Sequence, residues 1–478
     1  MRTVRGRVDS VVVVGAGLAG LSAALHLRGA GREVTVVERG PGPGGVAGRL
    51  EVAGHHIDTG PTVLTMPELL EEALAAVGDR LADRLDLVPL HPAYRAVFAD
   101  GAALDVHTDA EAMEDAVRRF AGDREAAGYR ALREWLTRLY RVERDRFVGA
   151  NFDAPWDVLG RDFATLVAMG GFRALDPVIA RFLRDPRLRR VFTFQSLYAG
   201  VAPRQARAAY AVIAYMDTIA GVYFPRGGMH AVPRALAAAA EDAGVVFRYS
   251  TEVTGYERKG SRVTAVRTAD DRIPCDAVVV TGAPPRRRRT RWSPSAVVVH
   301  LTSTATADDL AHHTISFGER WDETFREIID DGRLMTDPSL LLTTPTRTDP
   351  DLAPPGRHLH YLLAPCPNLE SAPLRWDTLA RPYAEELVGL LAERKLVPSD
   401  AEIGELALTT PDDWARRGHP AGTPFSLAHT VAQTGPFRPG NLPDRDGNVV
   451  LAGAATTPGV GIPPVLISGR LAAARLRA

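Results

Sequence analysis

One stretch near the N-terminus, residues 11–38, constrains the fold more than any other. The β-branched run at 11–14 is typical of a parallel strand that is buried on both faces. The sequence GAGLAG follows at 15–20, and leucines then recur at helical spacing until Gly29. A second β-branched strand at 34–37 ends at Glu38. This order predicts a strand–turn–helix–strand unit with a phosphate-binding turn at the first glycines.

Each glycine of this turn and the acid after the second strand has a physical task. The first glycine permits a tight turn, the second lets backbone approach a pyrophosphate, and the third lets the helix pack closely on its strands. The helix N-terminus offers free N–H groups to the phosphates, and the acid after the second strand can accept hydrogen bonds from ribose hydroxyls. The residues expected to contact the dinucleotide are Gly15, Gly17, Leu18, Ala19, Gly20 and Glu38.

A second glycine-rich loop, with the sequence RGPGPGGVAGR at 39–49, directly follows the ribose acid. A nicotinamide dehydrogenase usually continues with helix and strand here, so the loop favours a long, extended FAD. Glycine backbone could approach the cofactor, and a terminal arginine could neutralise phosphate charge. We expect contacts from Arg39, Gly45 and Arg49, with a glycine- and proline-rich surface loop as the alternative.

The C-terminal segment has a similar order of strand, glycine-rich loop and helix. An apolar strand at 449–452 runs into Gly453, then a loop with Gly461 and Pro463, then an apolar helix predicted at 465–476. The N-terminus of such a helix can stabilise negative charge at the electron-rich end of a reduced flavin. A purely structural strand–turn–helix unit is the alternative.

Composition excludes several other classes of protein. The 57 basic and 58 acidic residues leave a net charge of −1, so no global field indicates nucleic acid as a partner. Two cysteines, Cys275 and Cys366, cannot build a disulfide framework. No run of 18 apolar residues occurs, and glycines interrupt the N-terminal apolar stretch, which argues against a membrane span and a signal peptide. We expect a cytoplasmic protein, with peripheral contact to the inner face of the cell membrane left open.

The same motifs carry a family resemblance. The chain resembles the bacterial-type phytoene desaturases, FAD-dependent carotenoid desaturases of the amine-oxidase-like flavoprotein superfamily, from about residue 10 to residue 474. The matching segments are VVGAGLAGLS at 13–22, GGVAGR at 44–49, DTGPTVLTMP at 58–67, YFPRGGM at 223–229, LAHHTISF at 310–317, DPDLAPPG at 349–356, TPDD at 410–413 and GAATTPGVGIP at 453–463. Many members carry Thr-His-Pro-Gly where this chain has TTPG at 456–459.

The resemblance implies an α/β fold with a discontinuous Rossmann-like FAD-binding domain, a mixed-sheet substrate domain and a helical lid. The FAD domain would comprise residues 8–66, 223–283 and 440–478, and the substrate domain residues 67–125 and 284–439. Residues 126–222, rich in aromatic side chains, would form the lid over an apolar tunnel, although such spacing is also typical of ordinary core packing. Further expected cofactor contacts are Gly60, Pro61, Thr62, Val253, Gly453, Gly461, Ile462 and Pro463.

The implied reaction is desaturation of a linear carotenoid such as phytoene, with hydride transfer to flavin N5. Asp162 is the candidate catalytic acid or base, and an ordinary helix-cap or surface role is its alternative. His312 and His313 match the family motif, but no metal is expected, because no further ligand repeats at suitable spacing nearby. No second GxGxxG occurs, so a separate NAD(P)H domain is not expected, and electrons would pass to oxygen, a quinone or another carrier.

Three rival functions stay open. An amine oxidase would need a lysine facing the flavin, and the chain has only Lys259 and Lys395. A carotenoid isomerase or oxygenase is a second rival, and a prenyl-binding escort protein without flavin is a third. The arginine run 286–289, with Arg291 and Trp292, is either a solvated loop or a patch that docks on anionic lipid, with the indole at the interface.

Overall fold

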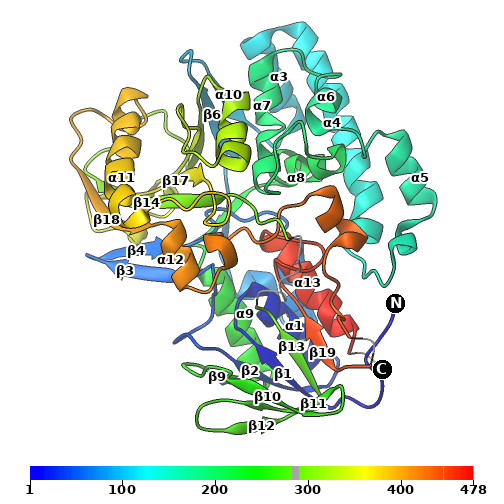
Figure 1. Cartoon of the computed structure of the whole chain (residues 1–478). Coiled ribbons are helices and arrows are strands. Elements are labelled where there is room, and N and C mark those ends of the chain that lie inside the picture. Colours follow the sequence, from blue (N-terminus) through cyan, green and yellow to red (C-terminus); the bar gives the residue numbers. More distant parts are fainter. Residues whose placement is uncertain (283–289, 445, 477–478) are drawn as a thin grey trace.

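A five-stranded parallel sheet carries the glycine-rich turn, and its strands come from distant parts of the chain. The computed structural model describes residues 1–282, 290–444 and 446–476. The strand order is β19-β13-β1-β2-β9, and all neighbouring pairs are parallel. The bounds are β1 (Ser10–Val14), β2 (Glu33–Val37), β9 (Val246–Arg248), β13 (Ala277–Val280) and β19 (Val449–Leu451). Figure 1 shows this Rossmann-like sheet at the bottom of the molecule.

Four helices belong to this part of the fold: α1 (Leu18–Gly29), α2 (Glu68–Ala75), α9 (Ala231–Asp242) and α13 (Ile462–Ala474). Helices α1 and α13 pack so closely that a Cβ at Gly469 would lie 2.3 Å from the carbonyl oxygen of Ala19. The C-terminal helix begins three residues before the predicted position 465, because two prolines fit a first helical turn, where N–H groups need no partner.

A small antiparallel sheet covers one face of the Rossmann-like sheet through an apolar cluster that includes Val12, Val266 and Val278. It consists of β10 (Gly255–Lys259), β11 (Arg262–Arg267) and β12 (Arg272–Pro274). The sequence suggests that segments 263–267 and 276–281 share one small sheet. That expectation is wrong, because β11 pairs antiparallel with β10, whereas β13 joins the parallel sheet.

The second large layer is a seven-stranded mixed sheet in the order β18-β14-β17-β16-β15-β6-β7. Its bounds are β6 (Tyr94–Phe98), β7 (Ala103–Val106), β14 (Ser295–Ser303), β15 (His313–Phe317), β16 (Leu340–Thr343), β17 (His358–Cys366) and β18 (Ile403–Thr409). Only the β6–β15 pair is parallel. The sequence also predicts strands at 296–301 and 358–363, and both predictions are confirmed, as β14 and β17. Helix α11 (Trp376–Glu393) packs on this sheet in a separate apolar core.

Helices α3 (Ala110–Ala121), α4 (Asp123–Glu143), α5 (Arg161–Ala168), α6 (Leu175–Ile179), α7 (Pro186–Val191) and α8 (Val212–Tyr215) form the helical layer. Figure 1 shows it beside the mixed sheet and above the Rossmann-like sheet. Several of its aromatic rings pack on one another. The ring centroids of Tyr129 and Phe192 lie 5.9 Å apart, and Tyr140 stacks on Tyr215 with their centroids 4.3 Å apart. Core packing therefore accounts for many of the aromatic positions.

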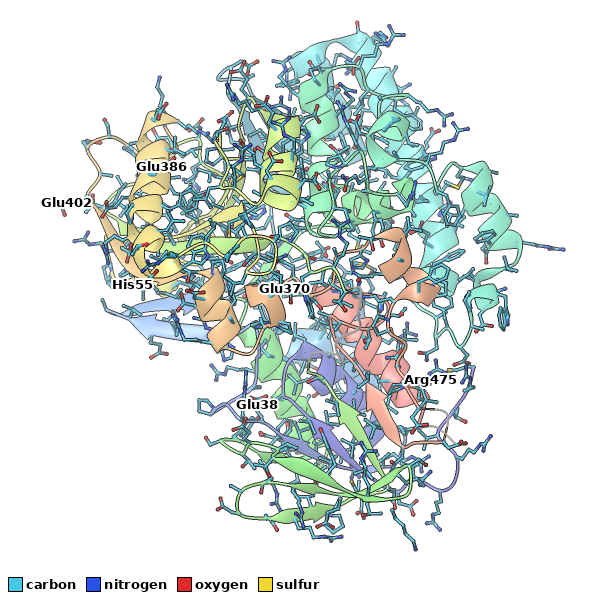
Figure 2. All side chains as sticks on the ribbon, in the orientation of Figure 1. Glu38, His55, Glu370, Glu386, Glu402 and Arg475 are labelled. Carbon is cyan, nitrogen blue, oxygen red and sulfur yellow. The ribbon has the colours of Figure 1, made fainter. Side chains whose placement is uncertain are left out.

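Both chain ends meet this helical layer at one point. Arg475, at the end of α13, is 1% exposed and binds the Asp153 carboxylate at 2.5 Å, and it donates to the carbonyl of Arg2 at 2.7 Å. The N-terminal amine lies 3.7 Å from the same carboxylate. Figure 2 labels Arg475 at this end of the helix. The ion pair joins the N-terminus, the C-terminal helix and the segment before α5.

Candidate functional site

At two positions of the first glycine-rich turn, no side chain larger than a hydrogen atom fits. Gly15 has φ +104°, and a Cβ there would lie 2.2 Å from the hydroxyl oxygen of Thr281. A Cβ at Gly20 would lie 2.0 Å from the carbonyl oxygen of Gly15. The turn therefore holds the N-terminus of α1 directly against the end of β1. No side chain caps this helix, and its first turn contains no acid.

The second glycine-rich loop lies against the start of α1. The N–H of Gly44 donates to the carbonyl of Ala16 at 2.9 Å, and a Cβ at Gly45 would lie 3.3 Å from the Cα of Gly17. A Cβ at Gly17 would lie 3.9 Å from the Cα of Gly45, which is an ordinary van der Waals distance. Two glycine backbones thus meet at the positive end of a helix, which is the arrangement that admits a phosphate group.

Glu38 and Arg39 follow β2 but point to different partners. The Glu38 carboxylate accepts hydrogen bonds from the N–H of Ala16 at 2.8 Å and of Gly40 at 2.7 Å, which fixes it beside the turn. Figure 2 labels Glu38 at this edge of the Rossmann-like sheet. The exposed Arg39 instead donates to the carbonyl of Arg417. The structure thus places Glu38 at the turn and turns the Arg39 guanidinium toward the segment after α12 (Pro411–Arg416).

Arg49 begins the hairpin β3 (Arg49–Val52) and β4 (His55–Asp58). Its side chain is 18% exposed, its Nε has no hydrogen-bond partner, and its nearest carboxylate oxygen, on Glu51, is 3.9 Å away. A mostly buried guanidinium whose N–H donor has no partner can bind an anionic group with little loss of solvation. This donor and the glycine contact at α1 fit the phosphates of FAD.

Asp58 ends β4 and caps another helix. Its carboxylate accepts the N–H groups of Met229 at 2.7 Å and His230 at 2.9 Å, just before α9. Burial raises the pKa of Asp58 to about 6 despite these bonds. Two residues on, a Cβ at Gly60 would lie 2.2 Å from the carbonyl oxygen of Val46. The segment with Gly60, Pro61 and Thr62 therefore lies directly against the second glycine-rich loop.

The C-terminal loop completes the arrangement. Gly453 has φ +107°, and a Cβ there would lie 3.3 Å from the carbonyl of Thr281 and 3.8 Å from the Cβ of Ala19. Ser468 of α13 binds the loop twice, accepting from the N–H of Gly453 at 3.0 Å and lying 2.7 Å from the hydroxyl of Thr456. Gly461 precedes α13, whose first residues are Ile462 and Pro463, and no side chain caps this N-terminus.

The structure thus gathers most of the predicted cofactor residues around the start of α1. Val253 packs at the edge of the apolar cluster beside β1 and β2, two residues after Thr251, whose N–H donates to the carbonyl of Glu38 at 2.8 Å. A small cavity, with room for about one water molecule, adjoins this region. Its lining residues are Ile57, Asp58, Thr62, Phe224, His300, Thr343, Pro345, Leu359 and Tyr361.

The histidines of the LAHHTISF segment are buried structural groups. His312 lies 2.7 Å from the hydroxyl of Thr348, and His313 lies 2.9 Å from that of Thr343. Burial lowers the pKa of His312 to about 3 and of His313 to about 4, so both are neutral. Within the described part of the chain, no group of three or more His, Cys, Asp or Glu side chains could hold a metal ion.

Two carboxylic acids of the helical layer differ sharply in setting. Asp162, at the start of α5, has a half-exposed side chain and lies 3.6 Å from the guanidinium of Arg146. Asp217 lies in a π-helical turn, residues 216–220, and accepts the Gln195 amide at 3.2 Å. Burial raises the pKa of Asp217 to about 8, and the phenols of Tyr94 and Tyr198 are close enough to feel its charge. Its MDTIA sequence has no distinctive signal, so only the long-range contact with Gln195 reveals it.

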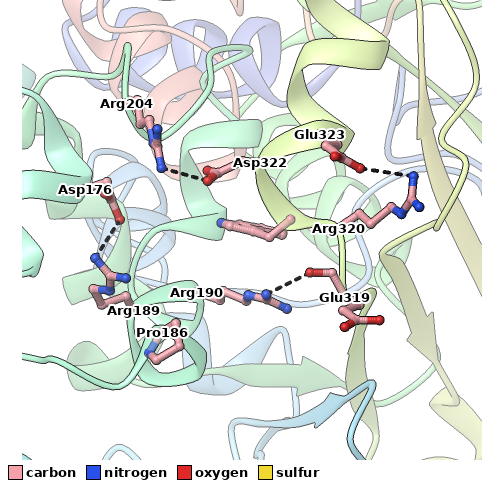
Figure 3. A pocket seen from close by; sticks show the side chains of 10 residues that line it. Asp176, Pro186, Arg189, Arg190, Arg204, Glu319, Arg320, Asp322 and Glu323 are labelled. Carbon is pink, nitrogen blue, oxygen red and sulfur yellow. Dashed lines mark hydrogen bonds and ion pairs between the residues drawn. The ribbon is translucent and has the colours of Figure 1, made fainter.

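A larger hollow lies at the surface between the helical layer and the mixed sheet, with a volume of about 280 Å³. Figure 3 shows that charged side chains line it and pair across it. Arg204 binds Asp322 at 2.7 Å, and Arg190 donates to the carbonyl of Glu319 at 3.0 Å. This charged hollow does not suit an apolar ligand.

Trp292 does not have the exposed position that a lipid-docking role requires. It is 8% exposed and pairs with Leu427 through a β-bridge. The expectation of an interfacial indole is therefore wrong, because packing buries it. The arginine run 286–289 lies outside the described residues. Among the described residues, no helix is long and apolar enough to cross a membrane.

Comparison with known proteins places this geometry in a family. The model of flavin containing amine oxidoreductases matches residues 18–477. A phytoene dehydrogenase of Streptomyces griseus is 62% identical over 100% of this chain and 96% of its own length. A zeta-carotene-forming phytoene desaturase of Myxococcus xanthus is 35% identical over 98% of this chain and 93% of its own length.

The solved structures agree on the fold. A putrescine oxidase bound to putrescine has a TM-score of 0.60 at 16% identity and covers 98% of both chains. The helix-terminal glycine contact, the C-terminal loop and the full-length similarity lead to one conclusion. The chain belongs to the flavin containing amine oxidoreductases and, among them, to the bacterial phytoene desaturase family.

Proposed function

We propose that this protein introduces double bonds into a linear carotenoid such as phytoene, with FAD as its cofactor. The observation that carries the proposal is the glycine-lined contact at the start of α1, in a chain 62% identical to a phytoene dehydrogenase. When bound, FAD supplies the hydride acceptor, its N5 atom. The electrons then leave to oxygen or a quinone.

The cofactor residues divide into three groups by their chemistry. Backbone N–H groups of Leu18, Ala19 and Gly20 would hold the pyrophosphate, with the buried Arg49 donor as counter-charge. Glu38 would accept the ribose hydroxyls, and Val253 would lie beside the adenine. Gly60, Pro61 and Thr62 and the C-terminal residues Gly453, Gly461, Ile462 and Pro463 would hold the isoalloxazine. Arg39 could join them only by leaving the carbonyl of Arg417.

The chain would work as three parts. Residues 8–66, 223–283 and 440–478 would bind FAD, and residues 67–125 and 284–439 would bind the polyene. Residues 126–222 would cover the polyene as a lid. A water-free channel that fixes the reacting CH–CH bond would supply much of the rate enhancement by positioning.

Desaturation also needs a group that accepts the second hydrogen as a proton. Asp162 stays the sequence-based prediction. Its half-exposed side chain forms a surface ion pair with Arg146, so it does not have the water-free surroundings that the reaction would need. Asp217 is the carboxyl group that we favour, because it is partly buried in the helical layer and has no arginine, lysine or histidine as a salt-bridge partner among the described residues. Its ionised form, whose population grows as pH approaches 8, would take a proton from the carbon next to the one that loses hydride.

The rival functions fit less well. An amine oxidase would place a lysine at the flavin, but Lys259 ends β10 at an exposed hairpin and Lys395 follows α11 on the mixed sheet. A prenyl-binding escort protein would not need the glycine contact between Gly17 and Gly45. A carotenoid isomerase or oxygenase remains as an outcome of the activity test.

Peripheral membrane contact has a candidate surface on the helical layer. Among the residues that the structure describes, six of the eight exposed large apolar side chains lie in two short segments: Trp156, Leu159, Val167, Phe172, Val431 and Phe437. The two segments touch, because residues 155–158 contact residues 435–437. Arg291 lies beside them, its N–H bound by Gln433 at 2.8 Å. Apolar side chains near arginines are typical of a surface that rests on anionic lipid.

Gly17→Ala tests the phosphate site without disturbing the fold. The backbone at Gly17 accepts any residue, and a Cβ would meet its protein neighbours at an ordinary 3.9 Å, yet it would fill the space beside the helix N-terminus. We expect a stable protein whose FAD affinity falls at least about tenfold, measured by flavin fluorescence. Gly42→Ala, in the second glycine-rich loop and with no neighbour within 4 Å of the added Cβ, is the control. Equal FAD affinity in both variants would contradict the phosphate assignment.

The reaction is tested by co-expression in a host that makes phytoene, followed by pigment analysis. We expect desaturated, coloured carotenoid from the wild type, and a 10²–10⁴-fold lower rate from Asp217→Asn if that carboxylate accepts the proton. Asp162→Asn is the matched comparison, and loss of activity in it alone would restore the sequence-based prediction. Unchanged phytoene despite bound FAD would refute the proposed substrate, and a shifted isomer or oxygenated product would support the rival enzyme class.

Asp217 should also leave a pH signature in stability. Its pKa is about 8 in the folded protein and near 3.8 in the unfolded chain, so between these values the folded state holds an extra proton. Stability therefore falls as pH rises through this window, by up to about 1.4 kcal/mol per pH unit. We expect Asp217→Asn to lessen the fall in Tm between pH 6 and pH 8, and Asp162→Asn to keep it. An unchanged profile in Asp217→Asn would show that this carboxyl group is already ionised.

The membrane surface is tested by flotation with vesicles that contain phosphatidylglycerol. The double variant Trp156→Ser/Phe437→Ser removes two exposed apolar groups, each contributing about 1.5–3 kcal/mol when buried in lipid. We expect at least a tenfold lower vesicle-bound fraction. Val246→Ser, which changes a 55% exposed side chain on β9, should float like the wild type. Wild-type flotation of the double variant would exclude this surface.

A further inference from the structure

A buried arginine hydrogen-bonds to the C-terminal loop of the candidate flavin site. Arg438 follows residues 435–437 and is 3% exposed. Its guanidinium donates to the carbonyls of Ala454 at 2.6 Å and Thr456 at 3.1 Å, both in that loop. It also donates to the carbonyl of Gln433 at 3.2 Å and, more weakly, to that of Leu427 at 3.4 Å. One side chain thus fastens the loop to the segment 427–433.

All of these partners are carbonyl oxygens. Among the described residues, no carboxylate lies within ion-pair distance of Arg438, in contrast to the equally buried Arg475, which binds Asp153. Burial lowers the pKa of Arg438 only to about 10, so the guanidinium is charged at neutral pH. Burying an unneutralised charge costs several kcal/mol, which the carbonyl bonds offset in part. A residue that only held the loop in place would not need that charge.

The neighbours of Arg438 are neutral. Tyr210, from the helical layer, lies 2.9 Å from Nδ1 of His429 and hydrogen-bonds the hydroxyl of Thr434. Burial holds the pKa of His429 well below its usual value, so the imidazole carries no charge. That ring lies against Gly459, where a Cβ would be 2.4 Å from it. The positive charge of this cluster therefore resides on Arg438 alone.

The same loop leads to a second positive feature. Four residues separate Thr456 from Gly461, where α13 begins without a side-chain cap and without an acid in its first turn. The N-terminus of a helix carries about half a positive charge. The loop is thus bounded by a whole cation at one end and a partial one at the other, and two such sources together favour a ligand that gains negative charge.

We propose that Arg438 is a positioning residue for the flavin: it holds residues 454–456 in place and supplies the positive charge that stabilises the reduced, negatively charged isoalloxazine. This inference rests on the proposed use of FAD. It adds a specific residue, away from the glycine motifs, that sets the reduction potential. Tyr210, His429 and Thr434 would carry this arrangement from the helical layer to the loop.

Sulfite provides the test, because its addition to oxidised flavin N5 places negative charge on the ring and needs no carotenoid. We would titrate FAD-bound wild type, Arg438→Gln and Arg438→Lys with sulfite and measure FAD affinity in parallel. We expect Arg438→Gln to weaken sulfite binding about tenfold and to lower the two-electron potential accordingly, since tenfold equals about 30 mV. Arg438→Lys keeps the charge but loses the forked set of guanidinium N–H donors. Its sulfite affinity should stay within threefold of the wild-type value, while its FAD affinity should fall.

Arg475→Gln is the matched control, because it removes a buried arginine from the far end of α13. It should lower Tm and leave sulfite affinity unchanged. Wild-type sulfite affinity in Arg438→Gln would overturn the inference. If that variant retains no FAD, Arg438→Lys decides: a tenfold loss of sulfite affinity despite the retained charge would overturn it, and near-wild-type affinity would support it. A wild type without bound FAD would refute the proposed function instead.

Discussion

The approach of two glycine backbones at the N-terminus of α1 is the constraint on which the rest of the site depends. Gly45 can lie against Gly17 only because neither carries a side chain, and Gly15 and Gly20 bring the helix onto β1 for the same reason. Close contact there brings the second glycine-rich loop to the start of a helix that no side chain caps, so backbone geometry more than charged side chains shapes this place for an anionic group. The C-terminal loop then reaches the same place, where Gly453 meets Ala19.

The two ends of the chain treat positive charge differently. At the N-terminal turn, the helix dipole and the partly unsatisfied Arg49 would serve phosphates that are charged at all times. At the C-terminal loop, Arg438 and the start of α13 would act, in our proposal, on a ring whose charge changes with its redox state. Permanent charge needs affinity, whereas changing charge needs a field that discriminates between two states. In this proposal the same elements of backbone and arginine supply binding at one end and electronic tuning at the other.

Local patterns predicted the local structure, and long-range contacts escaped them. The valine run and the glycine spacing predicted β1, α1 and β2, because burial on both faces and a tight turn leave a direct mark on the sequence. The pattern could not show that β11 and β13 belong to different sheets or that Leu427 covers Trp292, since partners distant in sequence decide both. Arg438 and Asp217 were invisible for the same reason: their significance lies in what buries them.

The helical layer packs on both sheets through one apolar core. This core includes Leu21 of α1, Leu132 of α4 and Leu188 of α7, and it extends to β6, β7 and β15 of the mixed sheet, where the ring centroids of Tyr94 and Phe194 lie 5.7 Å apart. The remaining strands of the mixed sheet and α11 have a core of their own. Where the helical layer meets α10 (Trp321–Phe325), the charged hollow of Figure 3 lies at the surface beside this apolar packing. Ion pairs at a solvated seam hold surfaces together only weakly. The apolar core, more than the ion pairs of the hollow, therefore joins the helical layer to the mixed sheet.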